Sequence, residues 1–323
     1  MADTPGTGER GAAYWSKLIH VGVHQGAVEL RPQLNELGLD EVHRICDRAW
    51  AYSRADFEPN ALVKLATSQW RETCALAGSI AESLMLGAAT YLESVWHSRA
   101  IAAGTEPAGM AIAQRYLADT SIDTAVSVGH RLINFVARVA RTVPDTRQQL
   151  GSVKQFQHLG DTYVPFVTDA REAWLSLNPG SLAALRAAIP ALHRDSVQAL
   201  EDLVQSEAWE KLFQTRAENF HRWRKEHESV SGVDQNSGRA SDIYDHAGNV
   251  IGKRVAAQPR RHTSSDGMTE RTTEVAGEGV RAVSKAVEAV ITDTLAVLPR
   301  LTGGFTLEID RNGQTRRMSM PIF

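Results

Sequence analysis

The sequence predicts an all-α fold, an up-down bundle of long helices with a polar insertion before the last helix and a short C-terminal β-hairpin. Apolar residues recur every three or four positions over long stretches, which is the spacing of an amphipathic helix. Strict alternation of apolar and polar residues, which is typical of a half-buried strand, is rare. Apolar residues make up 43% of the 323 residues, so the chain can bury a substantial core.

The first two long helices are expected from about 61 to 100 and from about 119 to 142. The second has the denser apolar pattern, and Pro144 follows its end. The connection between them, AAGTEPAGM, is short and contains two glycines and a proline. We therefore expect the pair to form an antiparallel α-hairpin.

A third helix is expected from about 195 to 213, with Asp195 or Ser196 as its cap, and a fourth from about 272 to 298. The chain then alternates around Arg311–Asn312–Gly313, which predicts a β-hairpin.

This pattern divides the chain into three parts. Residues 1–58 form an N-terminal helical segment, 59–300 the bundle, and 301–323 the C-terminal hairpin. Within the bundle, 231–270 is rich in Gly, Ser, Asp and Asn and is expected to be a mobile insertion. One β-hairpin is predicted inside this insertion, DIYDHAGNVIGKR, with its turn at His246 to Gly248.

Composition favours a soluble cytoplasmic protein. The net charge is −3, so any contact with a polyanion must come from a local basic patch. Two cysteines, Cys46 and Cys74, do not make a disulfide framework or a tetrahedral zinc site, and both are expected to be core thiols. The N-terminus lacks the features of a secretory signal, and no apolar run reaches the length of a membrane span. We expect no membrane contact.

The motif search gives no nucleotide-binding glycine loop, zinc-protease helix, nucleophile elbow or CxxC pair. His20 and His24 are spaced for one helix face, but no third ligand is suggested nearby, so they are interpreted as partly exposed histidines. We therefore expect neither a metal nor a cofactor.

One stretch, TRAENFHRWRKEH at 215–227, carries residue types that suit a phosphodiester. Arg216 offers a fixed guanidinium fork for phosphate oxygens, and His221 titrates near neutrality and can move a proton. Arg216 is expected to point toward the bundle, close in azimuth to Trp209, and His221 to fall in line with Leu203 if the helix stays regular.

The residues around this pair would complete an RNA-binding surface. The expected RNA-binding residues are Asn219, Arg222, Trp223, Arg224 and Lys225. The same residues could instead form a solvated helix end, because an Arg-x4-His spacing fixes only two positions. Arg186 and His193 show how such spacings arise, with Pro190 between them indicating a helix break.

The hairpin helices, the helix that ends in EKLFQTRAENFHRWR, the polar loop and the last helix together resemble the HEPN superfamily over 61–300. Its hallmark is R-x4-6-H near the end of a core helix. The resemblance implies a metal-independent endoribonuclease that dimerises around a composite cleft. Arg216 would stabilise the scissile phosphate, and His221 would assist attack by the 2′-OH to give a 2′,3′-cyclic phosphate.

The resemblance also implies a setting in toxin–antitoxin, defence or RNA-processing systems, with RNA, a second copy or an antitoxin as partner. Ala217 stands where the family usually has Asn, Asp or His, and Glu218 adds a negative charge, which bears on catalysis more than on the fold. Two alternatives stay open. One is a non-catalytic scaffold or partner-binding protein in which Arg216 pairs with Glu82 or Glu93. The other is a helical regulator that binds a small molecule.

Overall fold

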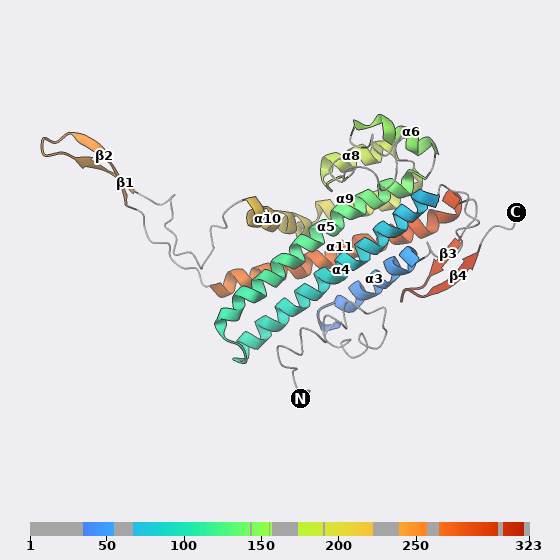
Figure 1. Cartoon of the computed structure of the whole chain (residues 1–323), viewed down its shortest axis with the longest axis horizontal. Helices are drawn as coiled ribbons and strands as arrows, with labels where there is room; N and C mark the ends of the chain where they lie inside the picture. Colours follow the sequence, from blue (N-terminus) through green and yellow to red (C-terminus); the bar gives the residue numbers. More distant parts are fainter. Residues whose placement is uncertain are drawn as a thin grey trace.

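The computed structural model describes residues 35–54, 67–142, 144–154, 156, 174–189, 191–221, 239–256, 265–302 and 306–319. Helices dominate these residues, which confirms the all-α class (Figure 1). Four of them lie side by side along the long axis: α3 (Leu39–Arg54), α4 (Thr67–Ala102), α5 (Ala111–Ala140) and α11 (Ser265–Thr302). Two shorter helices pack against α5 and α11, namely α9 (Arg194–Gln205) and α10 (Glu207–His221). Next to α9 lies α8 (Pro179–Ala188), which also contacts α6 (Pro144–Ser152).

The core lies where α4, α5 and α11 meet. Ile80, Ile122 and Val283, one from each helix, have no exposed surface. One stretch of α4, Arg71–Ala102, is long and apolar enough to cross a membrane, but 78% of its most apolar window is buried inside the bundle. This is the composition that a central helix of a bundle needs.

Two helices begin earlier than the apolar pattern predicts, α5 at Ala111 instead of about 119 and α11 at Ser265 instead of about 272. At this end the core is made of hydroxyls and amides. Ser94 Oγ lies 2.9 Å from Thr273 Oγ1, and Gln114 Nε2 donates to the same oxygen at 3.2 Å. Because these buried side chains are polar, apolar periodicity does not reveal the helices that carry them.

The expected single helix over 195–213 is wrong, because the chain breaks at Ser206. Its backbone is extended (φ −74°, ψ 142°) and separates α9 from α10. The Ser206 hydroxyl accepts a hydrogen bond from the amide of Trp209 at 3.2 Å, so Ser206 caps α10. The expected alignment of His221 with Leu203 fails for the same reason, since the two residues belong to different helices.

The expected cap of α9 is also different. Its N-cap residue is His193, whose side chain makes no capping bond. Asp293 of α11 performs this role from a distance in the sequence, accepting from the amide of Ser196 at 3.0 Å and from the Ser196 hydroxyl. A carboxylate at the amino end of a helix is favoured by the helix dipole.

Within the N-terminal segment the structure describes 35–54, where α3 packs along α4. Cys46 of α3 and Cys74 of α4 are both free and buried, as expected of core thiols, and burial raises the pKa of Cys46. His20 and His24 lie outside the described residues.

Both predicted β-hairpins form. In the insertion, β1 (Arg239–Tyr244) pairs antiparallel with β2 (Val250–Ala256), and Figure 1 shows this hairpin standing apart from the helices. At the C-terminus, β3 (Thr306–Ile309) pairs with β4 (Thr315–Ser319) across the predicted turn.

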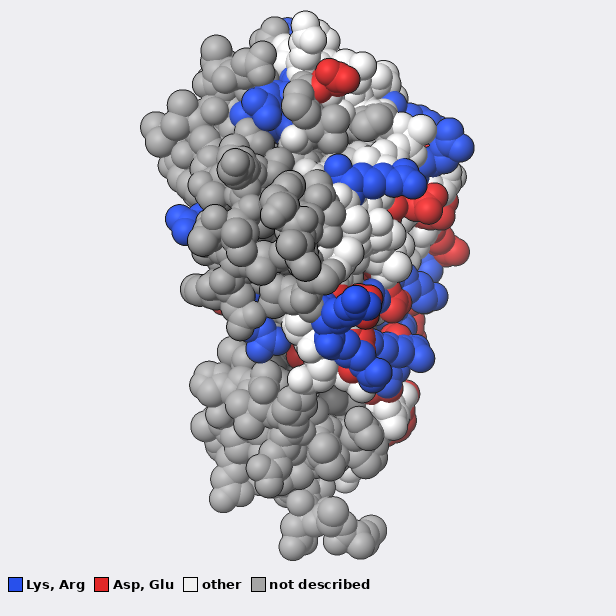
Figure 2. Space-filling model, turned by 90° about the vertical axis from the view of Figure 1, so that its right-hand side faces the viewer, with Lys and Arg blue, Asp and Glu red and all other residues white. Residues whose placement is uncertain are grey.

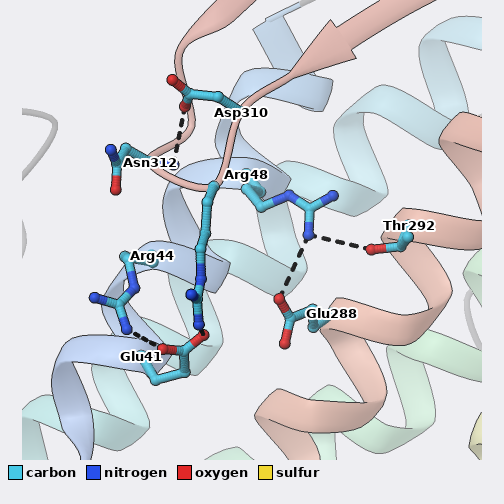
Figure 3. A network of polar contacts seen from close by, with 8 residues as sticks. Glu41, Arg44, Arg48, Glu288, Thr292, Asp310 and Asn312 are labelled. Carbon is cyan, nitrogen blue, oxygen red and sulfur yellow. Dashed lines mark hydrogen bonds and ion pairs between the residues drawn. The ribbon is translucent and has the colours of Figure 1, made fainter.

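The C-terminal hairpin is fastened to α3, and α3 to α11 (Figure 3). Arg311 in the turn donates to Glu41 at 2.9 Å. Arg48 donates to Thr292 at 3.1 Å and lies 3.5 Å from Glu288. On the face that carries this hairpin, the Lys and Arg side chains are interspersed with Asp and Glu (Figure 2).

Gly313 allows this docking. Its φ is +73°, and a Cβ there would lie 2.5 Å from the Cβ of Asp47 and 2.6 Å from the backbone of the same residue. We predict that Gly313→Ala lowers the free energy of unfolding by roughly 1–3 kcal/mol, because strain at φ > 0 adds to a backbone clash. Denaturant unfolding measures this loss.

Gly248 in the β1–β2 turn is the matched control, with φ +83° and no atom within 4 Å of the place that a Cβ would occupy. Gly248→Ala should leave the unfolding midpoint of the bundle unchanged. Equal stability of the two variants would show that the C-terminal hairpin is not held against α3.

Candidate functional site

The candidate site lies where α10 crosses α5, and Trp209 fixes the crossing. The Trp209 ring is buried against Gly129, where a Cβ would lie 2.4 Å from the ring. One turn later, Leu212 packs over Gly279 of α11, where a Cβ would again lie 2.4 Å away. The absence of side chains at these two glycines lets α10 approach both long helices closely.

Arg216 follows Trp209 by two turns and points toward α5, as the sequence predicts. Its Nε lies 3.7 Å from Oδ1 of Asp123, and the two side chains are 39% and 35% exposed. The Arg216 side chain is therefore partly exposed, although the Nε and Oδ1 atoms that face each other are buried. The carboxylate beside it is Asp123 of α5, and Glu93 lies 4.0 Å from Nε2 of His97.

Asp123 begins a polar stripe on α5 that continues through His130, Asn134 and Arg138. Spacings of seven, four and four residues keep these side chains on one face of a helix. We call these four residues the α5 polar stripe. Every member contacts a neighbouring element, so the stripe determines what packs on this face of α5.

Beyond Asp123, the stripe binds the extended backbone of 174–178. Asn134 accepts from the amide of Leu175 at 3.1 Å and donates to its carbonyl at 2.9 Å. Arg138 lies 5.3 Å from the centre of the Trp174 ring and donates to Glu72 at 2.7 Å in a buried ion pair. Breaking such a pair from one side costs about 3–5 kcal/mol, so Arg138 is a structural arginine.

His130 stands between the structural part of the stripe and Arg216. Its Nδ1 accepts from the amide of Leu177 at 2.9 Å, so the neutral ring carries its proton on Nε2. The ring also meets Trp209 edge to face, with centroids 6.1 Å apart. Burial, and then the positive charge of Arg216, lower the pKa of His130 to about 4. The imidazole is therefore neutral at pH 7.

The structure describes only part of the predicted site. Asn219 and His221 lie in the last turn of α10, and only their backbone is described. Arg222, Trp223, Arg224 and Lys225 lie outside the described residues. The RNA-binding assignments of these residues stay predictions.

The course of α10 bears on the Arg216–His221 pair. The helix is continuous from Glu207 to His221, and residues five apart differ in direction by about 140° in a regular helix. Because Arg216 lies on the face of α10 that packs against α5, position 221 lies on a different face of α10.

Asp123 and His130 were missed by the sequence analysis. Both lie in an amphipathic pattern on α5, and nothing in the spacing shows that α10 will cover that face. Among the described residues, no group of three or more His, Cys, Asp and Glu side chains is arranged to hold a metal ion. Comparisons of the chain with protein-family models, with curated proteins and with solved structures give no match.

The depressed pKa of His130 predicts a stability that depends on pH. Between about pH 6.5 and about pH 4 the unfolded chain binds a proton at this residue and the folded chain does not, so stability falls as the pH falls. His130→Asn keeps an oxygen that can accept the Leu177 amide proton but does not titrate. The wild-type chain loses unfolding free energy when the pH falls from neutral to acidic. We expect this loss to be smaller in His130→Asn, by on the order of 2 kcal/mol.

Urea unfolding at a series of pH values measures this difference. His246→Asn, in the exposed turn of the β1–β2 hairpin, is the control and should follow the wild-type profile. A wild-type profile for His130→Asn would show that the folded chain protonates this ring normally.

Proposed function

We propose that this chain is a HEPN-like RNA-binding protein that acts as a metal-independent endoribonuclease of a defence or toxin-type system in the cytoplasm. The observation that supports it best is the placement of Arg216. Its side chain is partly exposed near the end of α10, anchored by Trp209 two turns earlier and oriented by Asp123. A half-exposed, oriented guanidinium can meet a phosphate, which a fully buried one such as Arg138 cannot.

In the proposed reaction Arg216 binds the scissile phosphate of RNA and neutralises the charge that develops on its oxygens. His221 takes the proton from the 2′-OH, the 2′-oxygen forms a bond to phosphorus, and the bond to the 5′-oxygen breaks. The products are a 2′,3′-cyclic phosphate and a 5′-hydroxyl, which takes up a proton. Asp123 must yield its contact with Arg216, at least in part, when phosphate binds.

The different directions of Arg216 and position 221 support a composite cleft. Two residues about 140° apart on one helix can act on the same phosphate when the second comes from another chain. We propose a homodimer in which Arg216 of one chain and His221 of the other share a cleft.

The second candidate is a non-catalytic scaffold that binds a protein partner. The observation that favours it is the β1–β2 hairpin, whose large apolar residues are 41–66% exposed: Ile243, Tyr244, Val250 and Ile251. An isolated two-stranded hairpin is only marginally stable, so apolar cover from a partner such as an antitoxin would stabilise it. In this candidate Arg216 serves only to hold α10 to α5.

Cleavage of total RNA by the purified protein in EDTA tests the first candidate. We predict that His221→Ala and Arg216→Ala each lower the cleavage rate by on the order of a hundredfold or more. Arg216→Ala should change the free energy of unfolding by less than about 1 kcal/mol, because the ion pair that it removes is partly exposed. The end groups of the fragments, 2′,3′-cyclic phosphates, identify the reaction.

Asp123→Asn distinguishes the two candidates further. If Arg216 binds RNA phosphate, removing its competing carboxylate should tighten RNA binding. Asp242→Asn, which removes an exposed carboxylate on β1, is the matched control for the same change of one charge. Undiminished cleavage by both His221→Ala and Arg216→Ala would refute the site assignment, and a large loss of stability in Arg216→Ala would favour the scaffold.

A further inference from the structure

A second candidate site lies on a different part of the bundle, where α8 gives way to α9. A single turn of 3-10 helix, η3 (Ala191–His193), connects to the first residue of α9. The surface here contains a hollow with a volume of about 450 Å³. That volume is within the range of small-molecule sites, and its walls combine apolar side chains such as Ile189 and Val197 with four polar ones.

Two of these polar side chains are arginines. Arg194 is the first residue of α9 and is exposed. A cation at the amino end of a helix is opposed by the helix dipole, so this position disfavours arginine unless an anion is near. Asp195, exposed in the same first turn, is the nearest acid along the chain. No hydrogen bond or ion pair joins Arg194 to another residue within the described ranges.

Arg186 enters the hollow from α8 and is already oriented. Its Nη1 donates to both carboxylate oxygens of Glu201, at 2.8 and 2.9 Å. These bonds use one nitrogen of the guanidinium and leave Nε and Nη2 without a partner among the residues that the structure describes. Glu201 balances the charge of Arg186, so this wall offers the remaining guanidinium N–H groups in addition to the charge of Arg194.

The third observation is His193, which lines the same hollow and is only 1% exposed. Its Nε2 has no hydrogen-bond partner in the described part of the chain. A buried polar atom left without a partner costs about 1–3 kcal/mol, and such an atom in a native fold calls for an explanation. Burial lowers the pKa of His193 against the opposing effect of Asp293, so the ring is neutral.

Asp293 is not part of the lining; it accepts from the amide and hydroxyl of Ser196 and keeps its negative charge close to His193. What remains is a pair of guanidiniums, a helix amino end, the Gln198 amide and an imidazole, with apolar side chains between them. We propose that the hollow between α8 and α9 binds a small anion, a phosphate monoester or a carboxylate attached to a compact apolar body. This site does not depend on the function proposed for Arg216.

In the proposed complex Arg186 and Arg194 contact the anionic group from two sides. Gln198, whose Nε2 already donates to Asp202 at 2.7 Å, donates its second N–H to the ligand. The apolar body of the ligand lies against Ile189 and Val197. The His193 ring forms part of the inner wall, and its buried Nε2 reaches the ligand only if the ring turns. Arginine suits this role better than lysine because its planar fork matches both phosphate and carboxylate oxygens.

Calorimetric titration of the full chain tests the proposal with three probes: inorganic phosphate, phenyl phosphate and benzoate. Phenyl phosphate and benzoate share an apolar ring and differ in the anion, so their comparison identifies the preferred group. We expect at least one of them to bind, and more tightly than inorganic phosphate. Arg194→Gln should weaken that binding at least tenfold, and Arg317→Gln on β4 should not change it.

The ring nitrogen resonances of the histidines give an independent measurement. The probe that binds should shift the signal of His193, assigned by its loss in His193→Asn, and leave that of His130 in place. The proposal is overturned if neither ring-bearing probe binds. The proposal is also overturned if Arg194→Gln and Arg317→Gln weaken probe binding equally. In that case the loss of affinity would follow from the change of net charge and not from a contact in the hollow.

Discussion

The polar stripe on α5 is the constraint on which the arrangement of the shorter elements depends. Charged and amide groups on a buried helix need hydrogen-bond partners. The free-energy cost of leaving such a group unpaired exceeds the net stabilisation that a typical hydrogen bond provides. Arg138 is therefore paired with Glu72, Asn134 with the backbone of Leu175, and His130 with the amide of Leu177. These contacts hold the extended segment 174–178 against α5, and so fix where α8 begins.

The α5 polar stripe reaches the surface at Asp123, where polar groups no longer need a partner within the protein. Here the side chains of Asp123 and Arg216 are more than a third exposed, and an ion pair exposed to this extent contributes little to stability. Arg216 can therefore contact a phosphate ligand, whereas the buried Arg138 cannot. One face of α5 thus carries Arg138, which stabilises the fold, near one end. Near the other end the same face contacts Arg216, which can exchange its carboxylate partner for a phosphate.

Three arginines show how burial and pairing decide what a guanidinium can do. Arg138 is buried, bound to Glu72 and stacked on Trp174, which suits it to fold stability alone. Arg216 is half-exposed and oriented by the Asp123 carboxylate, which suits it to a phosphodiester. Arg194 is exposed at the amino end of α9, beside the already oriented Arg186, which suits that hollow to a small anion. Sequence alone does not separate these three cases.

The sequence by itself determined the all-α class, both hairpins and the approximate course of the long helices, because apolar periodicity and turn residues are local properties. It also placed Arg216 on the bundle side of its helix, since residues 209–216 belong to one regular helix. Tertiary structure decided the break at Ser206, the capping of α9 by Asp293 and the pairing of Arg216 with Asp123. Each of these joins groups far apart in the chain, and the early starts of α5 and α11 rest on buried hydroxyls that no apolar pattern records.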